Sequence, residues 1–197
     1  GHRRLAIIDP TERGAQPMHS ADGQLVITFN GEIYNYRELR HGLEARGCVF
    51  RSQSDTEVLL HLYAEHGEGM LAHLRGMYAF ALWDARHQTM LLARDPFGIK
   101  PLYYADDGHT LRLASQVKAL LAGGHIDTAP EPAGHVGFYL WGSVPAPYTL
   151  YRGIRALPAG HFLRVSGQGA AEPQPFCRIA DILAQAAAEP ARGSRAE

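Results

Sequence analysis

Residues 77–114 read MYAFALWDARHQTMLLARDPFGIKPLYYADDGHTLRLA, and the pattern of this stretch decides the fold class. Short apolar runs at residues 77–83, 89–93, 102–104 and 111–114 alternate with polar, turn-forming residues. Strands that follow one another through such short links run antiparallel. The stretch therefore predicts consecutive antiparallel strands.

Further strands are indicated on both sides of this stretch. Residues 4–9 (RLAIID), ended by Pro10, and residues 24–29 (QLVITF) have the apolar composition of buried strands. Residues 148–165 hold at least one more strand, which ends at residues 161–165.

Helix signals lie between the predicted strands. Asn35 reads as the N-cap of a helix that Gly47 ends, and Ser54 with Glu57 forms the capping box of a second helix. Two more helices are predicted at residues 115–122 and 133–141. The whole pattern predicts an α+β domain of antiparallel sheets covered by helices. The core pattern weakens after Gly167, so we expect the alanine-rich residues 184–197 to be a linker or tail.

The composition argues against several classes of function. A formal net charge of -1 over 197 residues gives no reason to expect a nucleic-acid partner. No apolar run approaches the length of a membrane span. The two cysteines, Cys48 and Cys177, suit neither a disulfide scaffold nor a thiolate metal site and fit a reducing cytosol. We therefore expect a cytoplasmic protein. The histidines lack metal-ligand spacing, so we expect no metal site.

Asn30 and Gly31 are the first candidates for chemistry. An Asn-Gly pair after a strand is most often only a turn. A loop between a buried strand and a capped helix is nevertheless a common place for binding groups. The Asn30 side-chain amide and the Gly31 N–H could donate two hydrogen bonds to one developing oxyanion.

Charged residues near this pair could hold the two ends of an amino acid. Arg4 is suited to binding a carboxylate, although, taken alone, a structural ion pair with a nearby acid is the better explanation. Asp55 stands at a predicted helix start, where the helix dipole favours a carboxylate, but it could also bind an ammonium group. If they converge, Arg4, Glu32 and Asp55 would recognise an α-amino acid.

A series of motifs carries a resemblance to a known family. In order along the chain they are HRRLAIID, AQPM, NGEIYNY, SDTEV, GMYAFALWD, ARDPFGIKPLYY, LAS with KALL, and LPAGH. The series resembles the class II glutamine amidotransferase domain of glutamine-hydrolysing asparagine synthetases over roughly residues 1–165. Sister families, the amidophosphoribosyltransferases and glucosamine-phosphate synthases, differ after Asn-Gly, and the former carry Arg where Lys100 stands. The resemblance implies an αββα, N-terminal nucleophile hydrolase fold.

The resemblance also implies residue roles. Arg4 would bind the glutamine carboxylate, with the backbone of Leu5, Ala6, Ile7 and Ile8 lining the pocket. Asn30 and Gly31 would form the oxyanion hole, and Glu32 and Asp55 would hold the α-amino end. For residues 94–104 we expect a structural role.

This sequence departs from the family pattern at its start and at one position inside the domain. The family's nucleophile is a cysteine at the start of the mature chain, activated by its own α-amine, and no cysteine stands there here. We therefore expect a domain at residues 1–165 that lacks its first strands and is inactive alone, followed by a linker at residues 166–197. A smaller departure is Gln116, where the family often has glutamate.

Partners and cofactors follow from the same resemblance. We expect glutamine as the substrate, no cofactor in this chain, and a synthetase domain in the longer protein that uses ATP and Mg to amidate aspartate. Two alternatives stay open: a non-catalytic glutamine-binding or packing module, and the amidotransferase domain of a synthetase with another acceptor.

Overall fold

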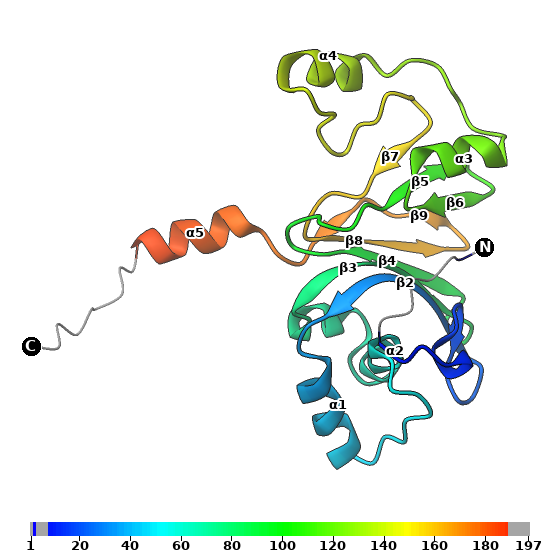
Figure 1. Cartoon of the computed structure of the whole chain (residues 1–197). Helices are drawn as coiled ribbons and strands as arrows, with labels where there is room; N and C mark the ends of the chain where they lie inside the picture. Colours follow the sequence, from blue (N-terminus) through cyan, green and yellow to red (C-terminus); the bar gives the residue numbers. More distant parts are fainter. Residues whose placement is uncertain (1, 3–7, 189–197) are drawn as a thin grey trace, which may run out of the picture.

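A computed structural model describes residue 2 and residues 8–188 as an α+β domain. Its layers are two helices, a large antiparallel sheet, a small antiparallel sheet, and further helices beyond the small sheet (Figure 1). The elements, in chain order, are η1 (Glu12–Gly14), β1 (Met18–His19), β2 (Leu25–Ile33), α1 (Tyr36–Ala45), α2 (Asp55–His66), η2 (Gly67–His73), β3 (Gly76–Asp84), β4 (Thr89–Arg94), β5 (Tyr103–Asp106), β6 (Leu111–Ala114), α3 (Val117–Gly123), α4 (Pro132–Trp141), β7 (Arg155–Ala156), β8 (His161–Ser166), β9 (Gly169–Ala170), β10 (Gln174–Pro175) and α5 (Ile179–Ala188).

The large sheet has the strand order β1-β2-β3-β4-β8-β10, with β9 also paired to β8. The small sheet has the order β6-β5-β7, and every pair in both sheets is antiparallel. The predicted antiparallel strands are therefore confirmed. The link from β4 to β5 is not a hairpin, because it carries the chain from one sheet to the other.

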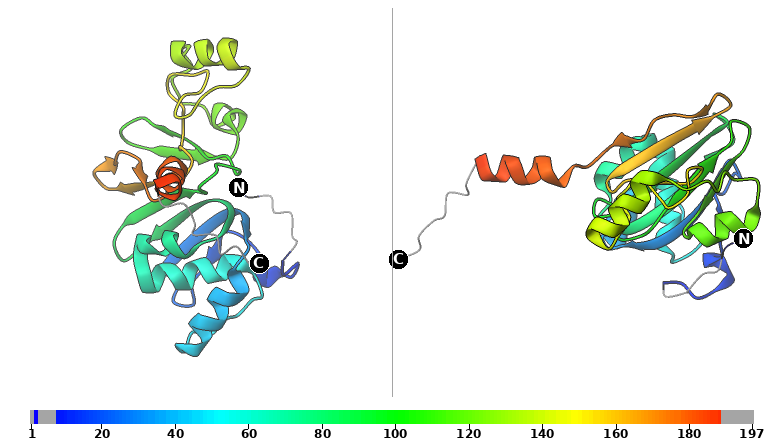
Figure 2. Two further views of the ribbon diagram at one scale, coloured as in Figure 1. Left: turned by 90° about the vertical axis from the view of Figure 1, so that its left-hand side faces the viewer. Right: turned by 90° about the horizontal axis from the view of Figure 1, so that it is seen from above.

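Two apolar layers hold the large sheet in place. On one face Tyr78, Phe80 and Leu82 of β3 pack against the apolar sides of α1 and α2. On the other face the small side chains of Ala79 and Ala81 meet residues of the small sheet and its links. The alternation along β3 thus separates the helix layer from the sheet–sheet layer. The two sheets pack face to face, as Figure 2 shows from the side.

Asn30 and Gly31 do not form the predicted loop. They lie inside β2, which pairs with β3 over its whole length, from Leu25 opposite Asp84 to Ile33 opposite Gly76. Gly31 permits this pairing, because a Cβ at this position would lie 2.1 Å from the carbonyl oxygen of Met77. Strand pairing therefore overrides the turn preference of the Asn-Gly dipeptide.

The helices begin close to the predicted positions, but their caps differ. The side chain of Asn35 makes no cap hydrogen bond and instead joins His73 O and Arg75 N, 3.0 Å from each. Ser54 caps α2 by accepting a hydrogen bond from Thr56 N at 3.2 Å. Glu57 does not complete the capping box, because its carboxylate binds the loop before the helix at Arg51 and Ser52.

The two ends of the chain bear on further predictions. Of the strand predicted at residues 4–9, only Ile8 and Asp9 belong to the described part, and neither is in a strand. Residues 179–188 form the helix α5, and the linker or tail predicted from residue 166 onward stays a prediction. None of the residues of α5 is buried, and the helix projects from the body (Figure 2). The domain boundary at residue 165 stays a prediction, although strand pairing continues through Pro175.

Candidate functional site

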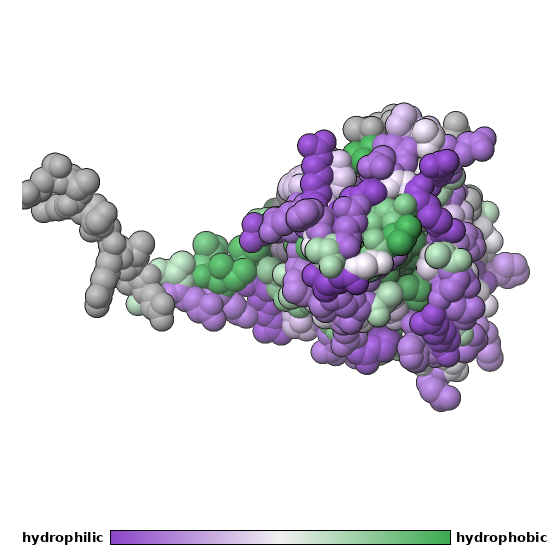
Figure 3. All heavy atoms as spheres, turned by 90° about the horizontal axis from the view of Figure 1, so that it is seen from below, coloured by the Kyte–Doolittle hydropathy of each residue, from purple (hydrophilic) through white to green (hydrophobic). Residues whose placement is uncertain are grey.

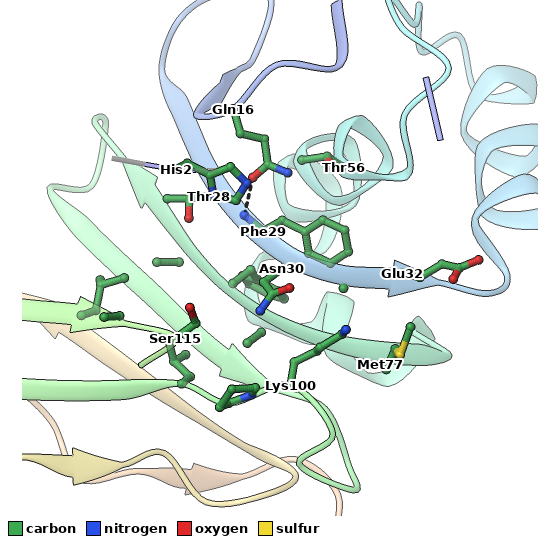
Figure 4. A pocket seen from close by; sticks show the side chains of 18 of the residues that line it. His2, Gln16, Thr28, Phe29, Asn30, Glu32, Thr56, Met77, Lys100 and Ser115 are labelled. Atoms are coloured by element: carbon green, nitrogen blue, oxygen red, sulfur yellow. Dashed lines mark hydrogen bonds between the residues drawn. The ribbon is translucent and has the colours of Figure 1, made fainter. Parts of the chain in front are cut away.

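A pocket of about 690 Å³ opens where the outer edge of β2 approaches the small sheet. Figure 4 shows Asn30 on the β2 side, with Lys100 and Ser115 reaching in from the other sheet. The predicted residues that line this pocket are Ile8, Asn30, Gly31, Glu32 and Asp55. Arg4, Leu5, Ala6 and Ile7 lie outside the described residues, so their roles stay predictions.

The outer edge of β2 presents backbone N–H groups to this pocket. Phe29 N donates to the Gln16 side chain at 2.6 Å, and Ile33 N donates to Asp55 Oδ2 at 3.1 Å. Because N–H groups of alternate residues point to the same edge of a strand, the Gly31 N–H also points outward, between these two. Side chains therefore accept hydrogen bonds from the N–H groups of Phe29 and Ile33, and the Gly31 N–H between them faces the pocket.

The opposite strand supports this direction. Tyr78 is the register partner of Gly31 in β3. Its carbonyl accepts a hydrogen bond from Asp95 N at 2.8 Å, and its N–H donates to Asp95 Oδ2 at 3.2 Å. Both backbone groups of Tyr78 are therefore directed away from β2, which makes Gly31 and Tyr78 a pair without hydrogen bonds between them. Within the described part of the chain, the Gly31 N–H has no side-chain or loop acceptor.

Asn30 adds a second donor beside the Gly31 N–H. Its register partner is Ala79, whose small side chain leaves space on the sheet–sheet face. The Asn30 side chain is exposed, and its amide points into the pocket in Figure 4. The amide and the Gly31 N–H come from adjacent residues on a rigid strand. This arrangement can place two preorganised donors on one oxygen atom.

The carboxylates of Glu32 and Asp55 lie near the end of β2. Asp55 is buried at the start of α2, and burial raises the pKa of its carboxyl group above the ordinary value. Hydrogen bonds from Ile33 N and Thr56 N oppose this rise, whereas the negative charge of Glu32 adds to it. Glu32 is half-buried, and in Figure 4 its carboxylate points away from Asn30. A ligand ammonium group near both carboxylates would relieve their mutual repulsion.

The turn between β4 and β5 is built as a rigid support. The Arg94 guanidinium donates to the carbonyl oxygens of Gly98, Lys100 and Leu157 at 2.7–2.8 Å. Burial lowers the pKa of Arg94. The buried Asp95 carboxylate accepts hydrogen bonds from four backbone N–H groups, two on each oxygen. These contacts support the structural role predicted for residues 94–104.

Sequence reasoning missed the side of the pocket that the small sheet supplies. Lys100, Ser115 and Gln116 line the pocket, as does Gln16 through its contact with β2. In the sequence, Lys100 and Gln116 stood out only in comparison with the family pattern. No pattern within the chain signals that the turn before β5 reaches the β2 edge, because that contact depends on the crossing between the sheets.

Neither cysteine is part of the pocket. Cys48 and Cys177 are free thiols, both half-buried, and neither lines the pocket. Within the described part of the chain, no group of three or more His, Cys, Asp or Glu residues could hold a metal ion. No helix among the described residues is long and apolar enough to span a membrane.

Comparison with known proteins assigns this arrangement to a family. The family described as a glutamine amidotransferase domain matches residues 1–177. The chain belongs to this glutamine amidotransferase family. Asparagine synthetase [glutamine-hydrolyzing] 3 of Bacillus subtilis is 39% identical over an alignment of 173 residues that covers 86% of this chain and 28% of that protein. Asparagine synthetase [glutamine-hydrolyzing] 1 of the same species is 41% identical over 169 residues, 86% of this chain and 26% of that protein.

Solved structures confirm the expected fold class. The glutamine phosphoribosylpyrophosphate amidotransferase of B. subtilis, complexed with ADP and GMP, is similar to this amidotransferase domain with a TM-score of 0.63 and 26% identity. The likeness covers 89% of this chain and 34% of that one. The sequence resemblance to glutamine-hydrolysing asparagine synthetases is likewise confirmed. The chain spans about a quarter of the length of these two synthetases.

Proposed function

We propose that this chain forms the glutamine pocket of a glutamine-hydrolysing amidotransferase. The observation that carries the proposal is that the Gly31 N–H, beside the Asn30 amide, has no acceptor among the described residues, whereas side chains accept hydrogen bonds from the flanking N–H groups of Phe29 and Ile33. A γ-carboxamide oxygen placed there would meet two donors as it becomes an oxyanion.

The other end of glutamine has matching groups. Glu32 and Asp55 line the same pocket and offer two carboxylates to an α-ammonium group. Arg4 is proposed to bind the α-carboxylate, as the family resemblance implies. The α-ammonium and γ-amide ends of glutamine would then be held at two separate points beside β2, and this would orient the reacting carbonyl group.

The activity of a longer protein is a further part of the proposal. Both B. subtilis relatives are glutamine-hydrolysing asparagine synthetases. We therefore propose that ammonia released from glutamine amidates aspartate in a synthetase domain that uses ATP and Mg. A cytoplasmic location is proposed with it, since both substrates and ATP are soluble metabolites.

Calorimetric titration with L-glutamine tests the pocket. We expect saturable binding by the wild-type chain and a loss of roughly tenfold or more for Asp55→Asn, which removes one charge opposite the ammonium group. Asp106→Asn is the matched control, because Asp106 is exposed at the end of β5, does not line the pocket and should not affect binding. Equal affinities of the two variants would contradict the assignment of Asp55.

The same samples can be assayed for glutamate release. Neither cysteine lines the pocket, and the family mechanism needs a thiol there. We expect the 197-residue chain to bind glutamine without hydrolysing it. Turnover comparable with that of a glutamine-hydrolysing relative would show that another residue acts as nucleophile.

A further inference from the structure

Lys100 brings a positive charge into the pocket from the side opposite β2. Its side chain is half-buried and lines the pocket, and Figure 4 shows it reaching from the small-sheet side toward the strand that carries Asn30. Its backbone is fixed on both sides: Lys100 N donates to Asp95 Oδ2 at 3.0 Å, and Lys100 O accepts from Arg94 Nε at 2.8 Å. The cation is thus delivered to the pocket from a rigid turn.

The charge of Lys100 has no counterpart within the described part of the chain. Its ammonium group makes no ion pair or hydrogen bond with any described residue. Outside that part, Gly1 and residues 3–7 (RRLAI) contain no carboxylate side chain, and residues 189–197 contain Glu189 and Glu197. A half-buried cation without a carboxylate partner among the described residues favours an anionic group in the space that it faces.

The carboxylates and the cation occupy different parts of the pocket. Glu32 points away from Asn30, and Asp55, at the start of α2, binds Ile33 N at the end of β2, where we place the ligand ammonium group. Lys100 enters from the opposite side of the pocket, and its side chain reaches between Asn30 and Met77. We propose that Lys100 recognises negative charge at the γ end of the bound amino acid, an inference that rests on the proposed function. Its ligand is then the γ-carboxylate of L-glutamate, the hydrolysis product, and Lys100 makes the pocket favour glutamate over neutral glutamine.

This role differs measurably from binding the α-carboxylate. Glutamine and glutamate share the α-carboxylate and the α-ammonium group and differ only in charge at the γ position. A residue that binds the α-carboxylate contributes equally to both ligands. A residue that senses γ charge contributes to glutamate alone, so the ratio of the two affinities isolates the effect.

The test is calorimetric titration of the full chain with L-glutamine and, separately, with L-glutamate. We expect Lys100→Met to weaken glutamate binding by roughly tenfold or more and glutamine binding by less than about threefold, as for one lost charge pair in a partly desolvated site. Lys100→Arg keeps the charge and should retain the glutamate preference. Lys118→Met is the matched control, because Lys118 is the one other lysine in the sequence, is exposed on α3 and does not line the pocket.

Each outcome decides between the proposals. Equal weakening of both ligands by Lys100→Met, or no weakening of either, would overturn the γ-charge role while the glutamine pocket stands. A Lys118→Met effect as large as that of Lys100→Met would overturn it as well. Failure of the wild-type chain to bind either amino acid would refute the proposed function and this inference together. Circular dichroism of Lys100→Met verifies that the variant is folded.

Discussion

Gly31 lies where the backbone of β3 closely approaches β2. A Cβ there would lie 2.1 Å from Met77 O and 2.7 Å from Tyr78 Cα, and the φ of Gly31 is +155°. We expect Gly31→Ala to lower the free energy of unfolding by roughly 2–4 kcal/mol through steric overlap and backbone strain. Urea denaturation measures the change.

A matched glycine provides the control for this substitution. A Cβ added at Gly69 in η2 would meet no atom within 4 Å, and Gly69 does not have a left-handed φ. Gly69→Ala should change the free energy of unfolding by less than about 0.5 kcal/mol. If both variants lose the same stability, close strand approach at Gly31 is not the reason for the glycine.

The raised pKa of Asp55 leads to a prediction of how glutamine affinity depends on pH. Burial raises the pKa of its carboxyl group above the ordinary 3.8, and the negative charge of Glu32 raises it further. A ligand ammonium group binds the ionised carboxylate, so affinity is complete above the raised pKa and is lost as the pH falls through it. Calorimetry from about pH 7 down to about pH 4 should show this fall together with proton release on binding. An affinity that stays constant down to pH 3.8 would exclude Asp55 as the ammonium ligand.

Single residues of the site differ in how far the sequence predicts them. Asn30, Gly31, Glu32 and Asp55 fall in motifs that resemble a family, and the structure places all four on one pocket. Their grouping does not follow from local patterns, because Asp55 meets β2 only through the packing of α2 on the sheet. Lys100 was missed for the same reason, since its position depends on the crossing from β4 to β5.

At the level of elements, the turn between β4 and β5 depends on one carboxylate. Asp95 is buried and accepts hydrogen bonds from Tyr78, Phe97, Ile99 and Lys100. In Asp95→Asn, the amide NH₂ faces N–H donors and leaves them without acceptors. We expect a loss of about 2–5 kcal/mol in the free energy of unfolding, measured by urea denaturation.

Asp106→Asn is again the suitable comparison for that change. Asp106 is exposed, and its carboxylate accepts a hydrogen bond from Gly108 N at 2.9 Å. Its substitution should cost less than about 1 kcal/mol. A loss for Asp95→Asn as small as this would mean that the turn is held by the Arg94 contacts instead.

Element types were predictable from the sequence where apolar periodicity is strong. The strands at residues 77–83, 89–93 and 111–114 and the helices that start near residues 35 and 54 all occur close to their predicted positions. The predictions of a loop at Asn30-Gly31 and of a capping box at Glu57 were wrong because tertiary contacts determine the local structure there. Strand pairing with β3 extends β2 through Asn30 and Gly31, and the Glu57 carboxylate binds the preceding loop instead of the helix end.

For the whole molecule, the two face-to-face sheets explain why the site lies where it does. β2 supplies N–H donors and the Glu32 carboxylate, the start of α2 supplies the Asp55 carboxylate, and the turn before β5 supplies a cation. Composition and strand order predict sheets covered by helices, but not which strands share a sheet. That division depends on the long-range packing of Ala79 and Ala81 against the small sheet.

Exposed large apolar side chains gather on two helices, α4 and α5. The face viewed in Figure 3 is mostly hydrophilic, and apolar side chains show on α5 where it projects from the body. Ile182 and Leu183 of α5 are 51% and 64% exposed, whereas the core residues of both sheets are buried. The pocket proposed to bind glutamine is lined by no residue of α5.

The central claim is that the Gly31 N–H and the Asn30 amide bind the γ-carbonyl oxygen of glutamine. Titration of the ¹⁵N-labelled chain with L-glutamine, followed by NMR, observes both groups directly. We predict saturable shifts of the Gly31 backbone amide and the Asn30 side-chain amide, with smaller shifts at Phe29 and Ile33, whose N–H groups are bound to Gln16 and Asp55. Saturable glutamine binding that leaves the Gly31 and Asn30 signals unmoved would contradict the account.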